Sequence, residues 1–400
     1  MIRYATSYRE TTLDDALARA QSVAGEFGIT RVTDITRLDR AGVPVFASVR
    51  PNACEGSLCV NAGKGLSTAE ARVGAYMEAI EFACAEPGRA CVGVQRARVK
   101  HVLDGDKRAD AILDLCPLVG TRISTDETMA CVAALDVDER RALVPAELVL
   151  YPYVPPHGRA YFGTTTNGLA SGSSVVEATV HALFEAIERD ISSAELFRHS
   201  SRQVDLATIP ALHAGLVQSI RDSGLDVAVR FAENQFGVAW LWALIWDPAE
   251  MDPVYATSGC GCHLDPDVAL ARAITEAAQT RLSFIHGARD DLTSRHQRFE
   301  GWSAARRRNY ATKLVASARR GRATHFRRIQ SDASQCSGLE DVLLSLTDRL
   351  ARQGMRRVLR VVLSDPRDPV CVVRVIVPLL EYFAPEVLRV GRRLRSYVAR

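Results

Sequence analysis

The stretch that decides the fold is Gly163–Phe197, GTTTNGLASGSSVVEATVHALFEAIERDISSAELF. Its first part, Thr164–Ser174, is so rich in Gly, Ser and Thr that we interpret it as a loop rather than a core element. The second part has the apolar periodicity of a long helix. Such a helix places Glu185 and Glu188 side by side, where they could share one ligand or cation. Taken alone, the stretch fits a solvated acidic helix after a flexible loop equally well.

The same arrangement occurs twice more in the chain. Glycine-rich runs followed by a helical pattern are found at 61–86, which begins NAGKG, and at 259–281, which begins GCGCH. The three predicted helices share a short skeleton: Glu78-Ala-Ile-Glu81, Glu185-Ala-Ile-Glu188 and Glu276-Ala-Ala-Gln279. One Glu-x-x-Glu pair carries no information, but three copies of a loop followed by such a helix predict a shared site.

A second repeated pattern is the order helix, strand, strand. The hydrophobic periodicity predicts it three times, with the helix at 11–27, 207–223 and 338–353. The strands follow at 29–35 and 43–50, at 225–231 and 237–246, and at 356–363 and 370–377. We therefore predict an α/β protein of repeated helix-strand-strand, ferredoxin-like modules packed around a central site. We treat 1–400 as one domain, divisible into submodules 1–150, 151–290 and 291–400.

Composition limits the classes that the protein can belong to. With 47% hydrophobic and 24% charged residues the chain is globular, and its net charge of +3 argues for no particular partner. The N-terminus lacks the apolar core of a signal peptide, and no apolar run approaches the roughly 18 residues that a membrane span needs. The ten cysteines are too dispersed for a disulfide framework. We expect a soluble, cytoplasmic protein.

Two local features leave alternatives open. Residues 305–328 hold nine Arg or Lys and no acid, and 389–400 hold five arginines. These segments could bind nucleic acid, but we favour a solvated helix surface or a face that meets an acidic partner, because no recognised nucleic-acid motif accompanies them. Cys260-Gly-Cys262-His263 could bind zinc, yet it lacks a second ligand pair at the usual spacing, so loop packing is favoured.

If the three helices converge, their carboxylates share a small volume, and such close negative charges require cations. The carboxylates are Glu78, Glu81, Glu185, Glu188 and Glu276. Oxygen ligands select Mg²⁺ or Ca²⁺, and Mg²⁺ commonly binds carboxylates together with substrate phosphates. Arg189, Arg272 and Lys64 would supply positive charge for phosphate, and glycine-rich loops would bring backbone N–H groups close. The pattern predicts a magnesium–nucleotide site that lacks the Walker motif.

At these residues the sequence resembles the YcaO family, ATP-dependent enzymes that activate peptide backbone amides. The resemblance covers nearly the whole chain, and its early part is most similar to the TfuA-associated branch. It rests on Arg9, FGITRVTDITRLDRAGVPVFASVRPN (27–52), GKG (63–65) with MEAIE (77–81), NGLASG (167–172) with EATVHALFEAIERD (177–190), RAITEAAQTR (272–281) and VIVPLLE (375–381). The chain departs from the family pattern at Gly74, Phe82, Ala170 and Ser173.

The resemblance implies the YcaO fold, with ATP and Mg²⁺ as cofactors. It implies that the five glutamates lie at the metal, and that nucleotide is contacted by Arg9, Ser173, Glu177, Arg189 and Arg272. A nucleophile of the substrate or an external sulfide would add to an amide carbon, and phosphorylation of the oxygen would then give an azoline or a thioamide. No protein nucleophile is required, and the residues supply none.

The chain has no proline after Pro385, unlike many azoline-forming members. This departure and the TfuA-like features favour a thioamide product. The implied partners are a precursor peptide or protein substrate and a TfuA-type or E1-like protein, and we expect a homodimer. Two other functions stay open: an accessory factor for methylthiolation of a ribosomal protein, and a nucleic-acid-binding protein.

Overall fold

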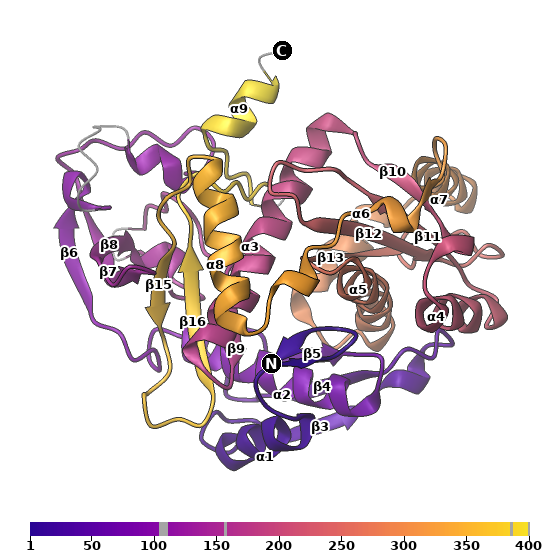
Figure 1. Cartoon of the computed structure of the whole chain (residues 1–400), viewed down its shortest axis with the longest axis horizontal. Helices are drawn as coiled ribbons and strands as arrows, with labels where there is room; N and C mark the ends of the chain where they lie inside the picture. The colour runs from indigo at the N-terminus through magenta and orange to yellow at the C-terminus, as the bar shows by residue number, and fades with distance from the viewer. Residues whose placement is uncertain (104–110, 156–157, 385–386, 399–400) are drawn as a thin grey trace. The chain divides into compact units, whose positions relative to one another are not determined.

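The computed structural model describes residues 1–103, 111–155, 158–384 and 387–398 (Figure 1). The chain is an α/β protein that divides into two compact units. Unit 1 comprises Met1–Asn52, Leu58–Ala79 and Ser200–Cys336, and unit 2 comprises Ala53–Ser57, Ile80–His199 and Ser337–Arg400. Each unit is therefore built from segments that are far apart in the sequence. The assignment of 1–400 to one domain stays a prediction.

Unit 1 contains two sheets and an N-terminal hairpin. The first sheet is antiparallel, with β3 (Arg31–Asp34), β4 (Val45–Val49) and β5 (Val60–Lys64) in that order. The second has the order β13 (Thr257–His263), β12 (Ala239–Trp246), β11 (Asp226–Phe231), β10 (Arg202–Asp205) and β14 (Thr324–His325), with only the β10–β14 pair parallel. The hairpin pairs β1 (Ile2–Arg3) with β2 (Tyr8–Arg9). Strands β5 and β13 are thus edge strands of their sheets.

The helices of unit 1 pack on these sheets. They are α1 (Leu13–Val23), the first part of α2 (Thr68–Ala85), α4 (Ala211–Asp222), α5 (Pro266–His286), α6 (Thr293–Phe299) and α7 (Ala304–Ala318). Helix α5 begins at its N-cap Asp265 with a proline in the first turn, and ends at Gly287 in the left-handed conformation. Helix α2 continues into unit 2 after Ala79.

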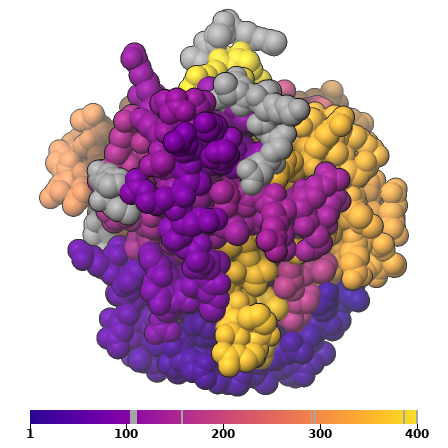
Figure 2. Space-filling view, turned by 90° about the vertical axis from the view of Figure 1, so that its left-hand side faces the viewer, coloured from indigo at the N-terminus to yellow at the C-terminus, as the bar shows by residue number. Residues whose placement is uncertain are grey.

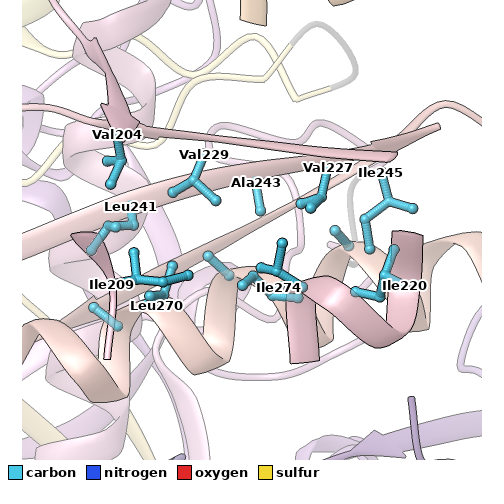
Figure 3. Close-up of a cluster of buried hydrophobic side chains, with 14 of the residues drawn as sticks. Val204, Ile209, Ile220, Val227, Val229, Leu241, Ala243, Ile245, Leu270 and Ile274 are labelled. Atoms are coloured by element: carbon cyan, nitrogen blue, oxygen red, sulfur yellow. The ribbon is translucent and has the colours of Figure 1, made fainter. Parts of the chain in front are cut away.

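A large core of unit 1 lies between α5 and the second sheet. Side chains on one face of β11 and β12 point toward Leu270 and Ile274 of α5, as Figure 3 shows for Val227, Val229 and Ile245. Further along α5, Leu282 packs against Val45, Ala47 and Ala62 of the first sheet. Helix α5 therefore buries side chains against both sheets, and burial of apolar surface is the main force that fixes its position.

The described residues of unit 2 form an antiparallel sheet. Its order is β6 (Val94–Arg98), β7 (Thr128–Asp136), β15 (Leu359–Val362), β16 (Cys371–Ile376) and β9 (Leu169–Gly172), and β8 (Arg141–Pro145) also pairs with β7. Strand β6 is largely exposed, in the purple region of Figure 2. Helix α3 (Val175–Arg198) contacts β9, β16 and helix α8 (Leu339–Arg352), and it also contacts the C-terminal helix α9 (Arg392–Val398).

All three predicted helix-strand-strand orders are present. They appear as α1-β3-β4, α4-β11-β12 and α8-β15-β16, with ends shifted by a few residues from the predicted bounds. Thr12 caps α1 by accepting a hydrogen bond from the backbone N–H of Asp15. Hydrophobic periodicity therefore located these elements correctly.

The interpretation of the glycine-rich runs as loops is wrong. The run Thr164–Ser174 contains the buried strand β9, and the other two runs contain β5 and β13. A Cβ atom on Gly63 would lie 2.1 Å from the backbone oxygen of Ala71 in α2, and one on Gly261 would lie 2.0 Å from that of Ala269 in α5. Only glycine permits a helix to pack so closely on a strand, and this packing explains the composition.

Candidate functional site

In each unit, the predicted site residues lie at edge strands of its sheets, which are β5 and β13 in unit 1 and β9 in unit 2, and on the helices beside them. In each case a predicted metal-binding glutamate accepts a hydrogen bond from a backbone N–H at the open edge of the strand. Glu78 Oε2 accepts from Ala62 of β5 at 2.8 Å, and Glu276 Oε1 accepts from Cys260 of β13 at 3.5 Å. Both pairs are 16 residues apart, so the two strand-helix units of unit 1 repeat the same local geometry.

The half of the site in unit 1 joins β5 to α5. Lys64 Nζ donates to Glu276 Oε2 at 3.1 Å and to Gln279 Oε1 at 3.0 Å, while Gln279 Nε2 donates to the carbonyl oxygen of Ala62 at 2.5 Å. The side chains of Lys64 and Glu276 are each 22% exposed, so the ion pair is partly shielded from water. In this structure Lys64 therefore contacts a carboxylate that was predicted to bind metal.

The charge state of Glu78 is set by opposing effects. Burial raises the pKa of its carboxyl group, whereas Arg289, the N–H of Ala62 and Lys64 act to lower it. The positive charges near this carboxylate come from two elements, β5 and the segment after α5. A half-buried carboxylate with cationic neighbours is typical of a functional site.

In unit 2, a glutamate of α2 likewise accepts from the edge strand β9, and the glutamates of α3 are partly or fully buried. Glu81 Oε1 accepts from both the backbone N–H of Ser171, at 2.8 Å, and its hydroxyl, at 2.6 Å. Glu188 on α3 is only 3% exposed and Glu185 is half-buried. The alternative of a solvated acidic face is therefore wrong for this helix, because a buried carboxylate needs compensating partners.

A buried arginine lies near two of these carboxylates. Arg374 of β16 is fully buried and donates from Nε to the oxygen of Val149 at 3.1 Å and from Nη1 to that of Asn167 at 2.9 Å. Within the described part of the chain its Nη2 has no hydrogen-bond partner. Burial lowers the pKa of Arg374 to about 10, and the attraction of Glu185 and Glu81 opposes this shift. The arginine thus supplies fixed positive charge to the acidic half-site.

The predicted nucleotide-binding residues lie on the site helices and strands or directly beside them. Ser173 donates to Glu177 Oε2 at 2.5 Å, beside Ser174, which caps α3. Arg189 lies on α3. In unit 1, Arg272 lies one turn before Glu276 on α5, and Arg9 of β2 donates from Nε to Ser7 Oγ at 3.1 Å. Each residue stands on an element that carries, or is bonded to, part of the candidate site.

The side chains of the candidate site can be compared with those that hold Mg²⁺ and a nucleotide in other proteins. Among the described residues, no group of three or more His, Cys, Asp or Glu side chains is placed to hold a metal ion, and this covers Cys260, Cys262 and His263. Mg²⁺ in nucleotide sites is commonly held by one or two carboxylates, substrate phosphates and water, and such carboxylates occur in each unit. Lys64, Arg189 and Arg272 provide charge for phosphate. The residues fit this ligand.

A model of the family described as YcaO cyclodehydratase, ATP- and Mg²⁺-binding, matches residues 62–381 of the chain. The chain belongs to the YcaO family. It is therefore an enzyme of the ATP-dependent YcaO cyclodehydratases, with ATP and Mg²⁺ as cofactors. The matched residues include all five glutamates, so the family assignment and the candidate site fall on the same part of the sequence.

Two curated relatives and a solved structure are similar to this YcaO chain over nearly its whole length. An uncharacterized protein of Methanothermobacter thermautotrophicus is 36% identical over 384 residues, which cover 93% of this chain and 94% of that protein. An uncharacterized protein in the tfuA 3' region of Rhizobium leguminosarum bv. trifolii is 32% identical, with 92% and 89% covered. The YcaO of Methanopyrus kandleri bound with AMPPCP and Mg²⁺ is 23% identical, with a TM-score of 0.76 over 98% of this chain and 97% of that one. The last comparison shows that the fold is shared.

Sequence reasoning missed two residues of the candidate site. Ser171 was part of the quoted stretch but had no role, and Arg374 was read only as part of a strand. Ser171 contacts a glutamate 90 residues away. Arg374 lies in the middle of an apolar strand. An arginine at such a position indicates a paired or functional charge, because an unpaired charge is almost never buried.

The two Arg-rich segments differ in the structure. Eight of the nine basic residues in 305–328 are exposed, as a solvated helix surface requires. In the C-terminal segment, by contrast, Arg389 is buried on backbone oxygens, Arg392 pairs with Asp114 at 2.7 Å and Arg393 pairs with Asp190 at 2.5 Å. These three arginines serve internal contacts rather than an open face. No helix in the described part of the chain is long and apolar enough to span a membrane.

Proposed function

We propose that this YcaO protein activates a backbone amide of a ribosomally made peptide or protein by O-phosphorylation, and that its product is a thioamide. The observation that carries the proposal is that Glu78, Glu81 and Glu276 are each fixed to the edge of a strand by a backbone N–H. Carboxylates held in this way need no reorganisation when a cation binds, and preorganised charge is usually the largest contribution to catalysis.

The roles of the side chains follow from their chemistry. Mg²⁺ would be held by glutamates of the two units, Glu78 and Glu276 in unit 1 and Glu81, Glu185 and Glu188 in unit 2. The nucleotide would be held by Arg9, Lys64, Ser173, Glu177, Arg189 and Arg272. When bound, ATP supplies the phosphoryl group that makes the amide oxygen a leaving group, and Mg²⁺ offsets its charge. Lys64 and Arg272 orient the phosphates from β5 and α5. Helix-strand-strand modules of the ferredoxin-like kind would form the frame around this nucleotide site.

The thioamide product and the partners are parts of the same proposal. The relative in the tfuA 3' region supports a TfuA-type partner, and the TfuA-like features of the sequence favour a thioamide over an azoline. In thioamide formation, an external sulfide adds to the amide carbon, and phosphate leaves with the former carbonyl oxygen. A homodimer in the cytoplasm and delivery of the peptide by an E1-like or TfuA-type protein complete the proposal.

Calorimetry tests the site. We expect wild-type protein to bind ATP in the presence of Mg²⁺, and Glu188→Gln to bind at least about tenfold more weakly, since removal of a charged metal ligand costs more than about 1.4 kcal/mol. Glu195→Gln, on the same helix but outside the predicted site, is the matched control and should bind as wild type. Equal affinity in Glu188→Gln and wild type would falsify the site assignment.

Mass spectrometry tests the product. A candidate precursor peptide from the gene neighbourhood is incubated with the protein, ATP, sulfide and the partner protein. Exchange of one oxygen for sulfur in the peptide identifies a thioamide, whereas loss of one water identifies an azoline. An unmodified peptide together with intact ATP binding would favour the accessory-factor function. Salt-sensitive RNA or DNA binding that survives charge reversal at Glu185 and Glu188 would favour a nucleic-acid-binding function.

A further inference from the structure

The N-terminal hairpin bonds to the ends of both site helices of unit 1. Thr6 Oγ1 donates to Glu70 Oε1 at 2.9 Å, and the Tyr8 hydroxyl donates to Asp265 Oδ2 at 2.9 Å. Glu70 lies in the first turn of α2, which carries Glu78, and Asp265 is the N-cap of α5, which carries Glu276. One short segment therefore reaches the N-terminal ends of two helices that are about 200 residues apart in the sequence.

In both contacts one oxygen of the carboxylate accepts from the hairpin, and the other accepts from backbone N–H groups at the start of the helix. Glu70 uses Oε2 to accept from the backbone N–H groups of Leu66, at 2.7 Å, and Ser67, at 3.2 Å, and leaves Oε1 for Thr6. Asp265 uses Oδ1 to accept from the N–H of Asp267 at 3.0 Å. The hairpin is thus bonded to the groups that cap the helices, which are the groups that fix where each helix begins.

The hairpin is itself held firmly. Tyr8 is 2% exposed, and its ring meets that of His263 edge-on with the centroids 4.5 Å apart. The Arg3 guanidinium lies 5.2 Å from the centre of the Tyr8 ring and donates to the oxygens of Ala333 and Cys336 at 2.9 and 2.7 Å. Burial and the nearby Asp265 carboxylate raise the pKa of Tyr8, so its hydroxyl stays a donor.

We infer that Thr6 and Tyr8 are positioning residues that set the spacing of α2 and α5, and with it the geometry of Glu78, Lys64 and Glu276 toward Mg²⁺ and ATP. The inference rests on the proposed function. Both helices meet β5 through short contacts, since Glu78 bonds to the N–H of Ala62 and Gln279 bonds to its oxygen. A shift of a helix end by about 1 Å would break these contacts, and misplacement of that size is costly in a reactive site.

The test compares Tyr8→Phe, Thr6→Val and the double variant with wild-type protein. Tyr4→Phe is the matched control, because it removes a hydroxyl from the same hairpin that donates no hydrogen bond to the described residues. ATP affinity is measured by calorimetry with and without Mg²⁺, and the melting temperature is measured in parallel. We expect each single variant to weaken Mg²⁺-dependent ATP binding by about threefold to tenfold, the worth of one hydrogen bond. Binding without Mg²⁺ should weaken less, and Tyr4→Phe should bind as wild type.

A lower melting temperature with Mg²⁺-dependent affinity within about twofold of wild type overturns the inference, since the hairpin would then only stabilise the fold. The variant Glu276→Gln distinguishes failure of the positioning role from failure of the proposed function. If Glu276→Gln loses ATP and the hairpin variants do not, the site stands and the positioning role is wrong. If Glu276→Gln binds as wild type, the site assignment is wrong and the inference falls with it.

Discussion

The side-chain amide of Gln279 donates a hydrogen bond from Nε2 to the carbonyl oxygen of Ala62, 2.5 Å away. Gln279 stands at the position that Glu81 and Glu188 occupy in the other two helices. A carboxylate at 279 would place one acceptor against another, because neither it nor a carbonyl oxygen carries a hydrogen to donate. The contact to the edge of β5 explains why the third copy of the skeleton ends in glutamine.

Gln279→Glu is therefore expected to destabilise the protein. It removes the donor to Ala62 and sets two oxygens against each other, while the stronger attraction to Lys64 offsets part of the loss. We expect the free energy of unfolding in urea to fall by about 1 kcal/mol. Gln330→Glu, at an exposed position, is the control and should change it little. A variant at 279 as stable as wild type would contradict the role of this hydrogen bond.

Substitution of Gly63 tests why the glycine-rich runs are strands. The Cβ of Gly63→Ala would lie 2.1 Å from backbone atoms of both Ala71 and Ala75, so α2 must move away from β5. We expect a loss of about 3 kcal/mol in unfolding free energy, at the upper end of overpacking costs. Gly215→Ala, within α4, meets nothing within 4 Å and should stabilise the protein by about 1 kcal/mol, the difference in helix propensity. Similar effects of the two substitutions would refute the close-packing explanation.

The same glycines mark the limit of what the sequence could predict. Apolar periodicity located α3 and the helix-strand-strand units, because burial on one face leaves a local pattern. It failed for β9, since a run such as Leu169–Gly172 is strand-forming only because a helix lies against it. The three Glu-x-x-Glu-like helices were visible as a repeat. The partners of Glu81 were not, because Ser171 lies 90 residues away and no local pattern encodes that contact.

The C-terminal helix should contribute to stability through one ion pair. Arg393 donates to both oxygens of Asp190, at 2.5 and 3.1 Å, and the side chain of Asp190 is fully buried. Removal of Arg393 leaves a buried carboxylate that has lost this ion pair and still accepts from the N–H of Glu381. We expect Arg393→Gln to lower the unfolding free energy by about 3 kcal/mol, as for other broken buried pairs.

Arg395→Gln is the matched control for this pair, because Arg395 is an exposed residue of the same helix. We expect its melting temperature to stay close to that of wild type, whereas that of Arg393→Gln should fall clearly. Since Asp190 follows Glu188 by two residues on α3, ATP affinity is measured on both variants as well. Equal melting temperatures of the two variants would show that the Asp190 contact adds nothing to stability.

His263 should make the protein less stable in weak acid. Burial, together with Arg272 and Arg3, lowers the pKa of His263 to about 3, whereas in the unfolded chain it is about 6.5. The folded state therefore excludes a proton that the unfolded state binds, so this stabilisation is complete above pH ~6.5 and is lost as the pH falls toward 3. At pH 5 the unfolding free energy is therefore lower by about 2 kcal/mol.

Urea unfolding at pH 7.5 and pH 5 should show this difference in wild type and not in His263→Gln. His101→Gln, at an exposed histidine, should behave as wild type. The same pH dependence in His263→Gln and wild type would mean that another group causes it.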